Sequence, residues 1–337
     1  MKKKILKIII ICVISIILLA FLAVSVASIW DRILYWDFYK NSEAGFDVPG
    51  LWSGFVQQGF DYIEERGVYI TSGYMSNGEA SRIYITDSKG DSTYVSLKLS
   101  DGSDNMAHAG GVTYYKDLIY VTGTGEKDGK KPTVDIYKMD DVLDGDGVAT
   151  SVDQMEICVK PSFIYARRGQ LYVGEFYKAV DYETDTSHHL TTPNGQEYKS
   201  LIAVYNLGEN GKSDSVVPDH VMSVRDMVQG MAFDNKGRLI LSTSWGTGAG
   251  HLYIYDMDTT VSVTGDMEIE GVPVRVRYIE EKDLDCTITT PPMIEEMVFD
   301  FDNNKLLIMT ESACMKYIFG KFTSGNHIYE YDYSTVK

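Results

Sequence analysis

The sequence is poor in proline and cysteine, and its basic residues are outnumbered by acidic ones. It has 8 Pro and 4 Cys in 337 residues, with 31 Lys and Arg against 48 Asp and Glu. No C-x-x-C pair is present, so a zinc ribbon or a thioredoxin-like motif has no support. The net charge of −17 also argues against nucleic acid as a partner, because an acidic surface repels phosphates.

Common catalytic signatures are missing as well. The chain contains no G-x-S-x-G, no H-E-x-x-H and no phosphate-binding P-loop. The acidic segment 140–147 resembles part of a calcium loop but lacks the closing Glu, and we interpret it as a turn. The known motifs therefore assign no reaction, and function has to be sought in the organisation of the chain.

One long apolar segment stands at the N-terminus. Residues 8–27 carry no charge and follow four lysines within the first seven residues. Twenty helical residues span about 30 Å, the hydrocarbon thickness of a bilayer. The lysines favour the cytoplasmic side, so we expect residues 1–27 to be a single-pass signal-anchor in the cell membrane with an extracytoplasmic C-terminal domain. The alternative is a cleaved signal peptide, since Ser25 and Ala27 are small enough for a cleavage site.

A strand–turn–strand pattern repeats five times after this segment. Each copy has a short strand, a polar turn and a second apolar strand. The copies read QGFDYIEERGVYITSG from Gln58, GGVTYYKDLIYVTGTG from Gly110, PSFIYARRGQLYVGEFY from Pro161, QGMAFDNKGRLILSTSWG from Gln229 and EEMVFDFDNNKLLIMTES from Glu295. A third strand follows every pair, and a fourth is expected at 93–99, 152–159, 221–228 and 272–279.

Four antiparallel strands repeated about every 50–70 residues are typical of a β-propeller. We predict an all-β, five-bladed propeller over residues 56–337, with six blades as the alternative if 28–55 hold a partial blade. The fifth copy lacks a fourth strand. The linker 28–55 is expected to supply a ring-closing strand at 46–52 or 33–39, which would leave no free edge.

The repeats resemble a known group of propellers. QGMAFDNKGRLILSTS and EEMVFDFDNNKLLIMTES are similar to blade starts of the lactonase-like and NHL-like propellers, which include gluconolactonase and strictosidine synthase relatives. HAGGVTYYKDLIYVTGTG is similar to blades of uncharacterised secreted bacterial propellers. The resemblance covers most of residues 56–333 as a repeat pattern, and it implies the fold more than the function.

The resemblance also implies a metal site that this chain matches only in part. Lactonase-like propellers hold a divalent metal in the channel through a Glu, an Asn and an Asp from blade starts. Glu295 or Glu296 matches the Glu by position, but Gln58 and Gln229 stand where Asn or Asp would be expected. This departure weakens the prediction of lactonase activity.

Polar side chains recur at one position of each blade. In a propeller the first strand begins at the same channel mouth where the second strand ends, so these residues converge there. We expect a binding site at this mouth and a metal ion, Ca²⁺ for its preference for oxygen ligands, at the adjacent Glu pair. The expected binding residues are His108, Glu175, Gln229, Trp245, Gln58 and Glu311, and the expected metal ligands are Glu295 and Glu296. Alternatively, one Glu is solvated and the other caps a neighbouring blade.

The longest insertions are expected at the same mouth. They are residues 178–200, residues 312–326 and the link 280–294 between blades four and five. Cys286 and Cys314 both fall in these segments, which predicts that they lie close enough for a disulfide; the alternative is free thiols.

Two functions are compatible with this organisation. One is an anchored binding module that holds an envelope protein, a glycan or a small ligand at its loop-rich mouth. The other is a metal-dependent hydrolase or lactonase of the propeller type. The sequence leaves open which of them applies, and therefore whether the protein is an enzyme.

Overall fold

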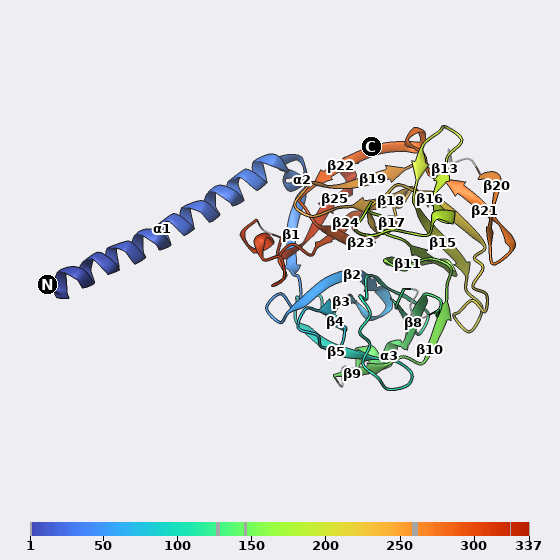
Figure 1. Ribbon diagram of the computed structural model, residues 1–337, viewed down its shortest axis with the longest axis horizontal. Coiled ribbons are helices and arrows are strands. Elements are labelled where there is room, and N and C mark those ends of the chain that lie inside the picture. The colour runs from blue at the N-terminus through green and yellow to red at the C-terminus, as the bar shows by residue number, and fades with distance from the viewer. Residues whose placement is uncertain (1, 126–128, 145–146, 258–261, 324, 337) are drawn as a thin grey trace.

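The computed structural model describes residues 2–125, 129–144, 147–257, 262–323 and 325–336. A ring of β-sheets carries one long helix, α1 (Lys2–Leu34), which projects from its side (Figure 1). Among the described residues, α1 is the one helix long and apolar enough to cross a membrane, judged by length and composition.

Five inner strands surround the central channel. Each contacts the next around the ring, and the last contacts the first. They are β2 (Phe55–Ile63), β6 (Val112–Tyr115), β11 (Phe163–Arg167), β17 (Val228–Phe233) and β23 (Ile294–Asp300). The five-bladed propeller predicted from the repeats is therefore confirmed.

Each inner strand begins an antiparallel sheet that runs outward. Blade one adds β3 (Val68–Met75), β4 (Arg82–Thr86) and β5 (Ser92–Lys98); blade two adds β7 (Leu118–Thr122), β8 (Thr133–Lys138) and β10 (Asp153–Glu156). Blade three adds β12 (Gln170–Gly174), β15 (Ser200–Asn206) and β16 (His220–Val224); blade four adds β18 (Leu239–Thr243), β19 (Gly250–Tyr255) and β22 (Leu284–Thr290). Blade five adds β24 (Lys305–Thr310), β25 (His327–Asp332) and β1 (Ser42–Asp47).

Short elements decorate the blades. The helices α2 (Trp36–Lys40) and α3 (Met139–Leu143) precede β1 and follow β8, and β9 (Val148–Thr150) pairs in parallel with β5. The insertion of blade three holds the 3₁₀ turn η2 (Thr186–His188) and the hairpin of β13 (Leu190–Thr191) and β14 (Glu197–Tyr198). The insertion of blade five holds η4 (Phe319–Phe322).

The apolar core lies between blades, because each sheet buries both of its faces against its neighbours. Ile164 and Leu171 of blade three pack toward blade two, whereas Phe163 and Tyr172 pack toward blade four. This two-sided burial explains the nearly continuous apolar runs of the second strands. It also makes each blade depend on both neighbours for its stability.

A strand from the N-terminal side completes the last sheet. β1 pairs antiparallel with β25, with Ser42 opposite Tyr331 and Ala44 opposite Tyr329. The strand overlaps the expected position 46–52 only at residues 46 and 47; residues 36–40 are helical, and Phe38 from that helix is buried against Tyr329. Pairing β25 covers a sheet edge that would otherwise be exposed.

The predicted fourth strand of blade four is wrong. Residues 272–279 correspond to β21 (Val272–Tyr278), which pairs in parallel with β16 of blade three and in antiparallel fashion with β20 (Ser262–Ile269). This hairpin covers the outer edge of blade three. Blade four uses β22 instead, within the segment 280–294 that was expected to be a loop, and its alternating burial fits an outer strand.

The predicted disulfide is also absent, and all four cysteines are free thiols. Cys286 lies on β22 opposite Ile254, at the outside of blade four. Cys314 is buried one turn after Glu311 in blade five, where its backbone N–H donates to the Glu311 carbonyl at 3.1 Å. The pairing failed because residues 284–290 form a strand rather than a loop over the channel.

Candidate functional site

The channel axis is closed by one carboxylate, that of Glu296 on β23. Its Oε2 accepts hydrogen bonds from the backbone N–H groups of Phe60 at 2.9 Å and Val112 at 3.4 Å, and its Oε1 accepts one from Ile164 at 3.1 Å. These donors lie on β2, β6 and β11, so one side chain joins four of the five inner strands. Glu296 is 2% exposed.

Glycines at the equivalent position of other blades leave room for this carboxylate. Aligned on the repeats, Glu296 corresponds to Gly59, Gly111 and Gly230. A Cβ on Gly59 would lie 2.4 Å from the Val112 nitrogen, and one on Gly230 would lie 2.8 Å from the Glu296 Cα. The inner strands approach this closely at the three glycines because no side chain stands there, and the Glu296 side chain of the fifth copy occupies the space that they leave.

Burial and hydrogen bonding act in opposite directions on the pKa of Glu296. Burial raises its pKa well above the usual value, and the three backbone N–H groups oppose that shift. Both of its oxygens are already used as acceptors. Glu296 is therefore placed to hold the ring together rather than to face the mouth.

The mouth above the axis is a pocket of about 650 Å³. Five of the six expected binding residues line it: Gln58, His108, Gln229, Trp245 and Glu311. Four blades contribute these side chains. Gln58 and Gln229 lie in the first half of inner strands, His108 lies before one, and Trp245 and Glu311 follow second strands. These five side chains therefore converge on one pocket, as the repeat pattern predicted.

Glu311 lines this pocket and forms a carboxyl pair with Glu295, which is buried and is not itself a lining residue. They are hydrogen-bonded to each other, and Gln229 Nε2 lies 3.4 Å from Glu295 Oε1. Burial and then the charge and hydrogen bond of Glu311 raise the pKa of Glu295 well above its usual range. Burial also raises the pKa of Glu311, to about 7. Near neutral pH the pair therefore shares a proton and carries at most one negative charge.

Gln58 links this pair to His108. Its Nε2 donates to Glu311 Oε2 at 2.9 Å, and its Oε1 lies 2.7 Å from His108 Nε2. An amide oxygen only accepts, so this network assigns the proton of His108 to Nε2 and leaves Nδ1 as an acceptor. Surrounding protein, then the charges of Lys316 and Lys160, lower the pKa of His108 to about 4. The His108 side chain is exposed at the mouth, and its lowered pKa keeps the imidazole ring neutral at pH 7.

An aromatic wall and two lysines complete the mouth. Trp245 lies 5.9 Å from Phe176 and 5.6 Å from Tyr182, measured between ring centroids. Lys316 lines the same pocket and its Nζ donates to the Tyr74 hydroxyl at 2.6 Å, while the Nζ of Lys160 lies 5.8 Å from the centroid of the Tyr182 ring. The charged residues that line the pocket are Lys160, Lys316 and Glu311, so the mouth has a positive balance within a protein of net charge −17.

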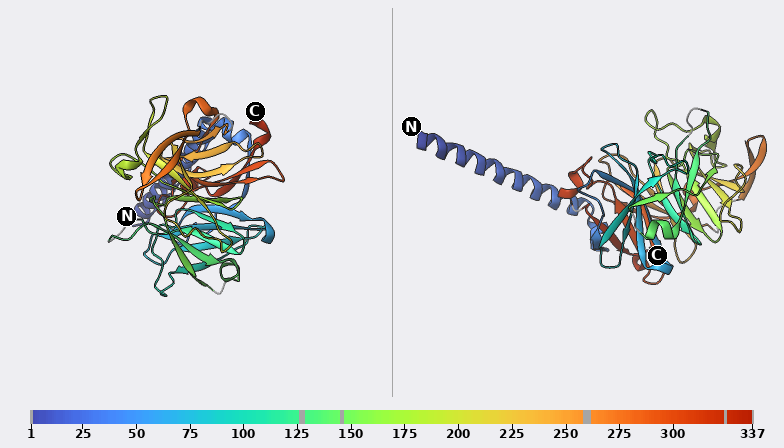
Figure 2. Two further views of the ribbon diagram at one scale, coloured as in Figure 1. Left: turned by 90° about the vertical axis from the view of Figure 1, so that its right-hand side faces the viewer. Right: turned by 90° about the horizontal axis from the view of Figure 1, so that it is seen from below.

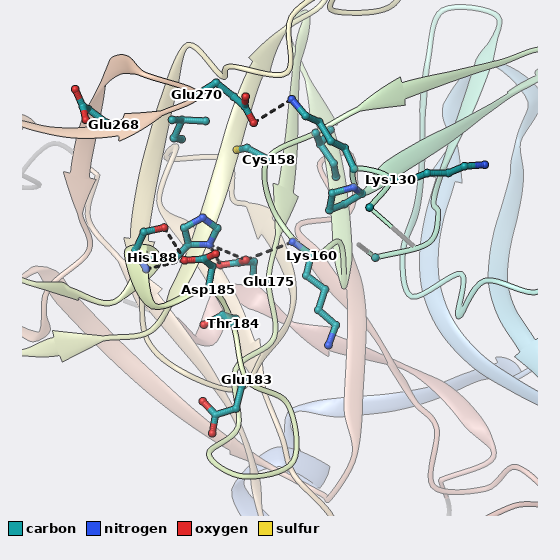
Figure 3. Close-up of a pocket in the computed structure, with 17 residues that line it drawn as sticks. Lys130, Cys158, Lys160, Glu175, Glu183, Thr184, Asp185, His188, Glu268 and Glu270 are labelled. Atoms are coloured by element: carbon teal, nitrogen blue, oxygen red, sulfur yellow. Dashed lines mark hydrogen bonds and ion pairs between the residues drawn. The ribbon is translucent and has the colours of Figure 1, made fainter. Parts of the chain in front are cut away.

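Glu175, the sixth expected residue, lies in a neighbouring pocket of about 610 Å³ between blades two and three. Figure 3 shows His188 pointing at its carboxylate, with His188 Nδ1 2.9 Å from Glu175 Oε1. The backbone N–H groups of Lys160 and Leu201 also donate to Glu175, at 3.3 Å and 3.2 Å. This arrangement ties the blade-three insertion, which carries His188, to the sheet.

The second pocket contains the paired side chains of His188 and Glu175 and a cysteine that is not activated. Burial lowers the pKa of His188, but the hydrogen bond and charge of Glu175 outweigh it and the net shift is upward. Cys158 also lines the pocket, and burial raises its pKa to about 11. It therefore stays a thiol at neutral pH, without the nucleophilicity of a thiolate. Lys160 lines both pockets.

Sequence reasoning missed several residues of the mouth. Phe176 follows Glu175 directly at the end of a second strand, so the repeat pattern contained its signal. Lys160, Tyr182, Lys316 and Tyr317 lie before an inner strand or in the two insertions. Their loop placement depends on tertiary packing, and no local pattern in the sequence reports it.

Within the described part of the chain, no three or more His, Cys, Asp or Glu side chains gather where they could hold a metal ion. Glu296 has committed its oxygens to backbone donors, and Glu295 faces Glu311 and Gln229. The metal site that the adjacency of these two residues suggested, and the Ca²⁺ expected there, stay predictions.

Comparisons with known proteins add structural likenesses of low identity. No protein-family model and no curated protein matches the chain. The fold is similar to the PQQ-bound form of an aldose sugar dehydrogenase from Streptomyces coelicolor, at 13% identity and TM-score 0.40 over 80% of this chain and 76% of that one. It is similar to the PQQ domain of a pyranose dehydrogenase from Coprinopsis cinerea, at 12% identity and TM-score 0.44 over 81% of this chain and 74% of that one. A GH43_1 enzyme from Xanthomonas citri is similar at 11% identity and TM-score 0.46 over 87% of this chain and 90% of that one. Similarity this low says nothing about the activity of the present chain.

Proposed function

We propose that the protein is a membrane-anchored binding protein whose propeller holds a small anionic ligand at the channel mouth. The observation that carries the proposal is the make-up of the mouth pocket. An aromatic wall of Trp245, Phe176 and Tyr182 shares a pocket of about 650 Å³ with Lys160 and Lys316. Concave pockets with apolar walls and a few convergent polar groups are the usual form of small-ligand sites.

The anchor of this proposal is α1. Its apolar residues 8–27 are exposed in the structure, and a bilayer would cover them. The four lysines before them favour a cytoplasmic N-terminus, and with that orientation the ring would lie on the other side of the membrane. The mouth would then open to the extracytoplasmic space.

The chemistry of the mouth favours an acidic, ring-shaped ligand such as an acidic sugar. Flat aromatic faces at Trp245 and Tyr182 suit the apolar face of a ring. The two lysines offer ammonium groups to a carboxylate or a phosphate. His108, neutral and with Nδ1 as an acceptor, suits a hydroxyl donor of the same ligand. A repellent acidic surface around a positive mouth would also direct anions to the one place that accepts them.

Ligand titration of the full chain in detergent, read by intrinsic fluorescence and calorimetry, tests the proposal. The probes are short uronic-acid oligosaccharides and their neutral counterparts. We expect the acidic probes to bind and the neutral ones to bind much more weakly. Lys160→Gln with Lys316→Gln should abolish that preference, whereas Lys236→Gln, an exposed lysine in the β17–β18 turn, should leave it unchanged. Equal binding of acidic and neutral probes by the parent protein would refute the charge argument.

A second candidate is hydrolysis, favoured by the Glu295–Glu311 pair. Two carboxyl groups that share a proton can supply a general acid and a general base. If the ligand is cleaved, Glu311→Gln should abolish turnover while binding persists. Binding without turnover in the parent would leave the first candidate alone.

Calcium is tested separately by thermal unfolding with and without the ion. An ion that binds the folded state alone raises the melting temperature by mass action. A rise that Glu295→Gln removes would support a cation at the carboxyl pair, and no rise would count against the lactonase-like version of the enzyme.

A further inference from the structure

Three of the four tryptophans lie at the place where α1 leaves the ring. Trp30, Trp36 and Trp52 are 64%, 63% and 79% exposed, whereas the fourth, Trp245, lines the mouth. Figures 1 and 2 show that α1 leaves the side of the ring beside β1 and the C-terminal insertion. Large exposed aromatic side chains gathered at one place indicate a surface with a partner.

Contacts between three segments make this region one surface. η4 packs against α1. Lys321 of η4 donates to the Leu51 carbonyl at 2.9 Å, and its Nζ lies 3.9 Å from the centroid of the Trp52 ring. Ile33 on α1 and Phe322 on η4 are 61% and 43% exposed. We call Trp30, Ile33, Trp36, Trp52 and Phe322 the aromatic collar.

The end of α1 is held firmly to the ring. The Tyr39 hydroxyl donates to Asp31 Oδ2 at 2.5 Å, and the Arg32 guanidinium lies 5.0 Å from the Tyr39 ring centroid. Phe38 is buried to 1%, and β1 begins four residues later within the last sheet. The collar therefore keeps a fixed position relative to the helix.

We infer that the aromatic collar lies in the headgroup interface of the bilayer that α1 enters, so that the ring is docked on the membrane rather than tethered above it. The inference rests on the proposed anchoring. Trp30 follows the apolar residues 8–27 by three positions, about 4.5 Å along a helix, which is the depth where tryptophan belts occur. Arg32 and Lys321 suit the same layer, because long basic side chains reach toward lipid phosphates.

Docking would also set the position of the mouth. The insertion 312–326 lines the mouth through Lys316 and Tyr317 and carries η4 of the collar. The same segment thus contacts both the ligand pocket and the lipid surface. A docked ring would hold its pocket at a fixed height over the membrane, suited to ligands that are themselves near that surface.

The small number of tryptophans allows a direct test. The full chain is reconstituted into phosphatidylcholine vesicles with or without brominated acyl chains, which quench nearby indoles. Four variants each keep one tryptophan, with the other three changed to Phe. We expect strong quenching for the variants that keep Trp30, Trp36 or Trp52, and severalfold weaker quenching for the one that keeps Trp245, the internal control. Thermal unfolding checks that each variant folds.

The possible outcomes separate docking from anchoring. If Trp30 is quenched and Trp52 is not, α1 spans the bilayer but the collar meets something else, such as another membrane protein, and the inference is overturned. If Trp30 is not quenched, the anchoring itself fails. In the chain that keeps Trp36, adding Phe322→Glu should reduce quenching of Trp36, whereas Phe301→Glu, at an exposed position on the turn after β23, should not.

Discussion

Glu296 and Glu295 are neighbours on one strand, yet they belong to two regions with different needs. Glu296 lies on the channel axis and accepts hydrogen bonds from three backbone N–H groups of three other blades. Glu295 is buried next to the mouth, and its partners are the side chains of Glu311 and Gln229, which line it. Both are almost completely buried.

The difference teaches how to distinguish a structural carboxylate from a functional candidate when burial is equal. Backbone donors are fixed by the fold, so a carboxylate that satisfies them stabilises it. Side-chain partners can be rearranged. A buried pair of carboxyl groups without backbone donors lowers the stability of the fold, so its presence suggests a functional role. Glu175 is intermediate, with two backbone donors and His188.

Removing the axial carboxylate should have the largest effect. Glu296→Leu leaves the N–H groups of Phe60, Val112 and Ile164 without an acceptor, and each unsatisfied buried donor costs about 1–3 kcal/mol. We expect the free energy of unfolding to fall by about 3 kcal/mol or more, measured by denaturant titration. Glu296→Gln retains one acceptor oxygen and should lose less. Glu295→Gln is the matched control on the same strand. If all three variants lose the same stability, the contrast between axis and mouth is broken.

The carboxyl pair should make stability depend on pH in the opposite sense to a salt-bridged carboxylate. The pKa of Glu311 is about 7 in the folded protein against a usual value of 4.5, so the folded state binds more protons between these values. Stability should therefore fall as pH rises from about 4.5 to about 7, by on the order of 3 kcal/mol from this residue. Below that window the carboxyl is protonated in both states and contributes no slope.

Unfolding curves of the parent and of Glu311→Gln across this range isolate the effect. The variant should lose less stability with rising pH than the parent. Parallel pH profiles would mean that Glu295 and Glu311 do not share a proton in the folded protein.

The intermediate case, Glu175 with His188, should titrate in a higher window. The pKa of His188 is raised above 6.5, so its contribution is complete below pH 6.5 and is lost as pH rises through the raised value. His188→Gln should therefore destabilise by about 1–2 kcal/mol at about pH 6 and by less at about pH 9. Melting temperatures at the two pH values check this. A cost that is independent of pH would show that His188 acts only by packing.

The sequence was sufficient for the ring and insufficient for the details of the mouth. Five strand–turn–strand copies predicted five blades because strand alternation and turn chemistry are local. The repeats also placed Gln58, His108, Gln229, Trp245 and Glu311 around one opening, since equivalent positions of a propeller converge.

The errors arose where pairing is not local. Residues 272–279 alternate like any strand, and nothing in them shows that they pair with blade three instead of blade four. Glu296 was grouped with Glu295 by adjacency, but the two residues lie where the register of β23 with β24 shifts, between Ile294 and Met297, and their side chains have different partners. The Gly of the aligned copies was the available signal that this position lies on the axis. Lys316 and Tyr317 reach the mouth through an insertion whose path only the tertiary structure defines.

The smallest effect on stability is expected at the mouth, and with it the largest effect on ligand binding. Trp245 is 41% exposed, and its ring neighbours are Phe176, Tyr182 and the Nζ of Lys178 at 5.5 Å from the indole centroid. Trp245→Ala should change the free energy of unfolding by about 0.5 kcal/mol or less, as is usual for exposed positions.

Because the indole is the widest face of the proposed pocket, the same change should weaken binding of the acidic probe about tenfold or more, the equivalent of about 1.4 kcal/mol. Trp36→Ala, at a more exposed tryptophan that does not line the mouth, is the control for both measurements. If Trp245→Ala binds the probe as the parent does, the ligand does not use the aromatic wall. If it unfolds the ring, Trp245 belongs with Glu296 among the residues that maintain the fold.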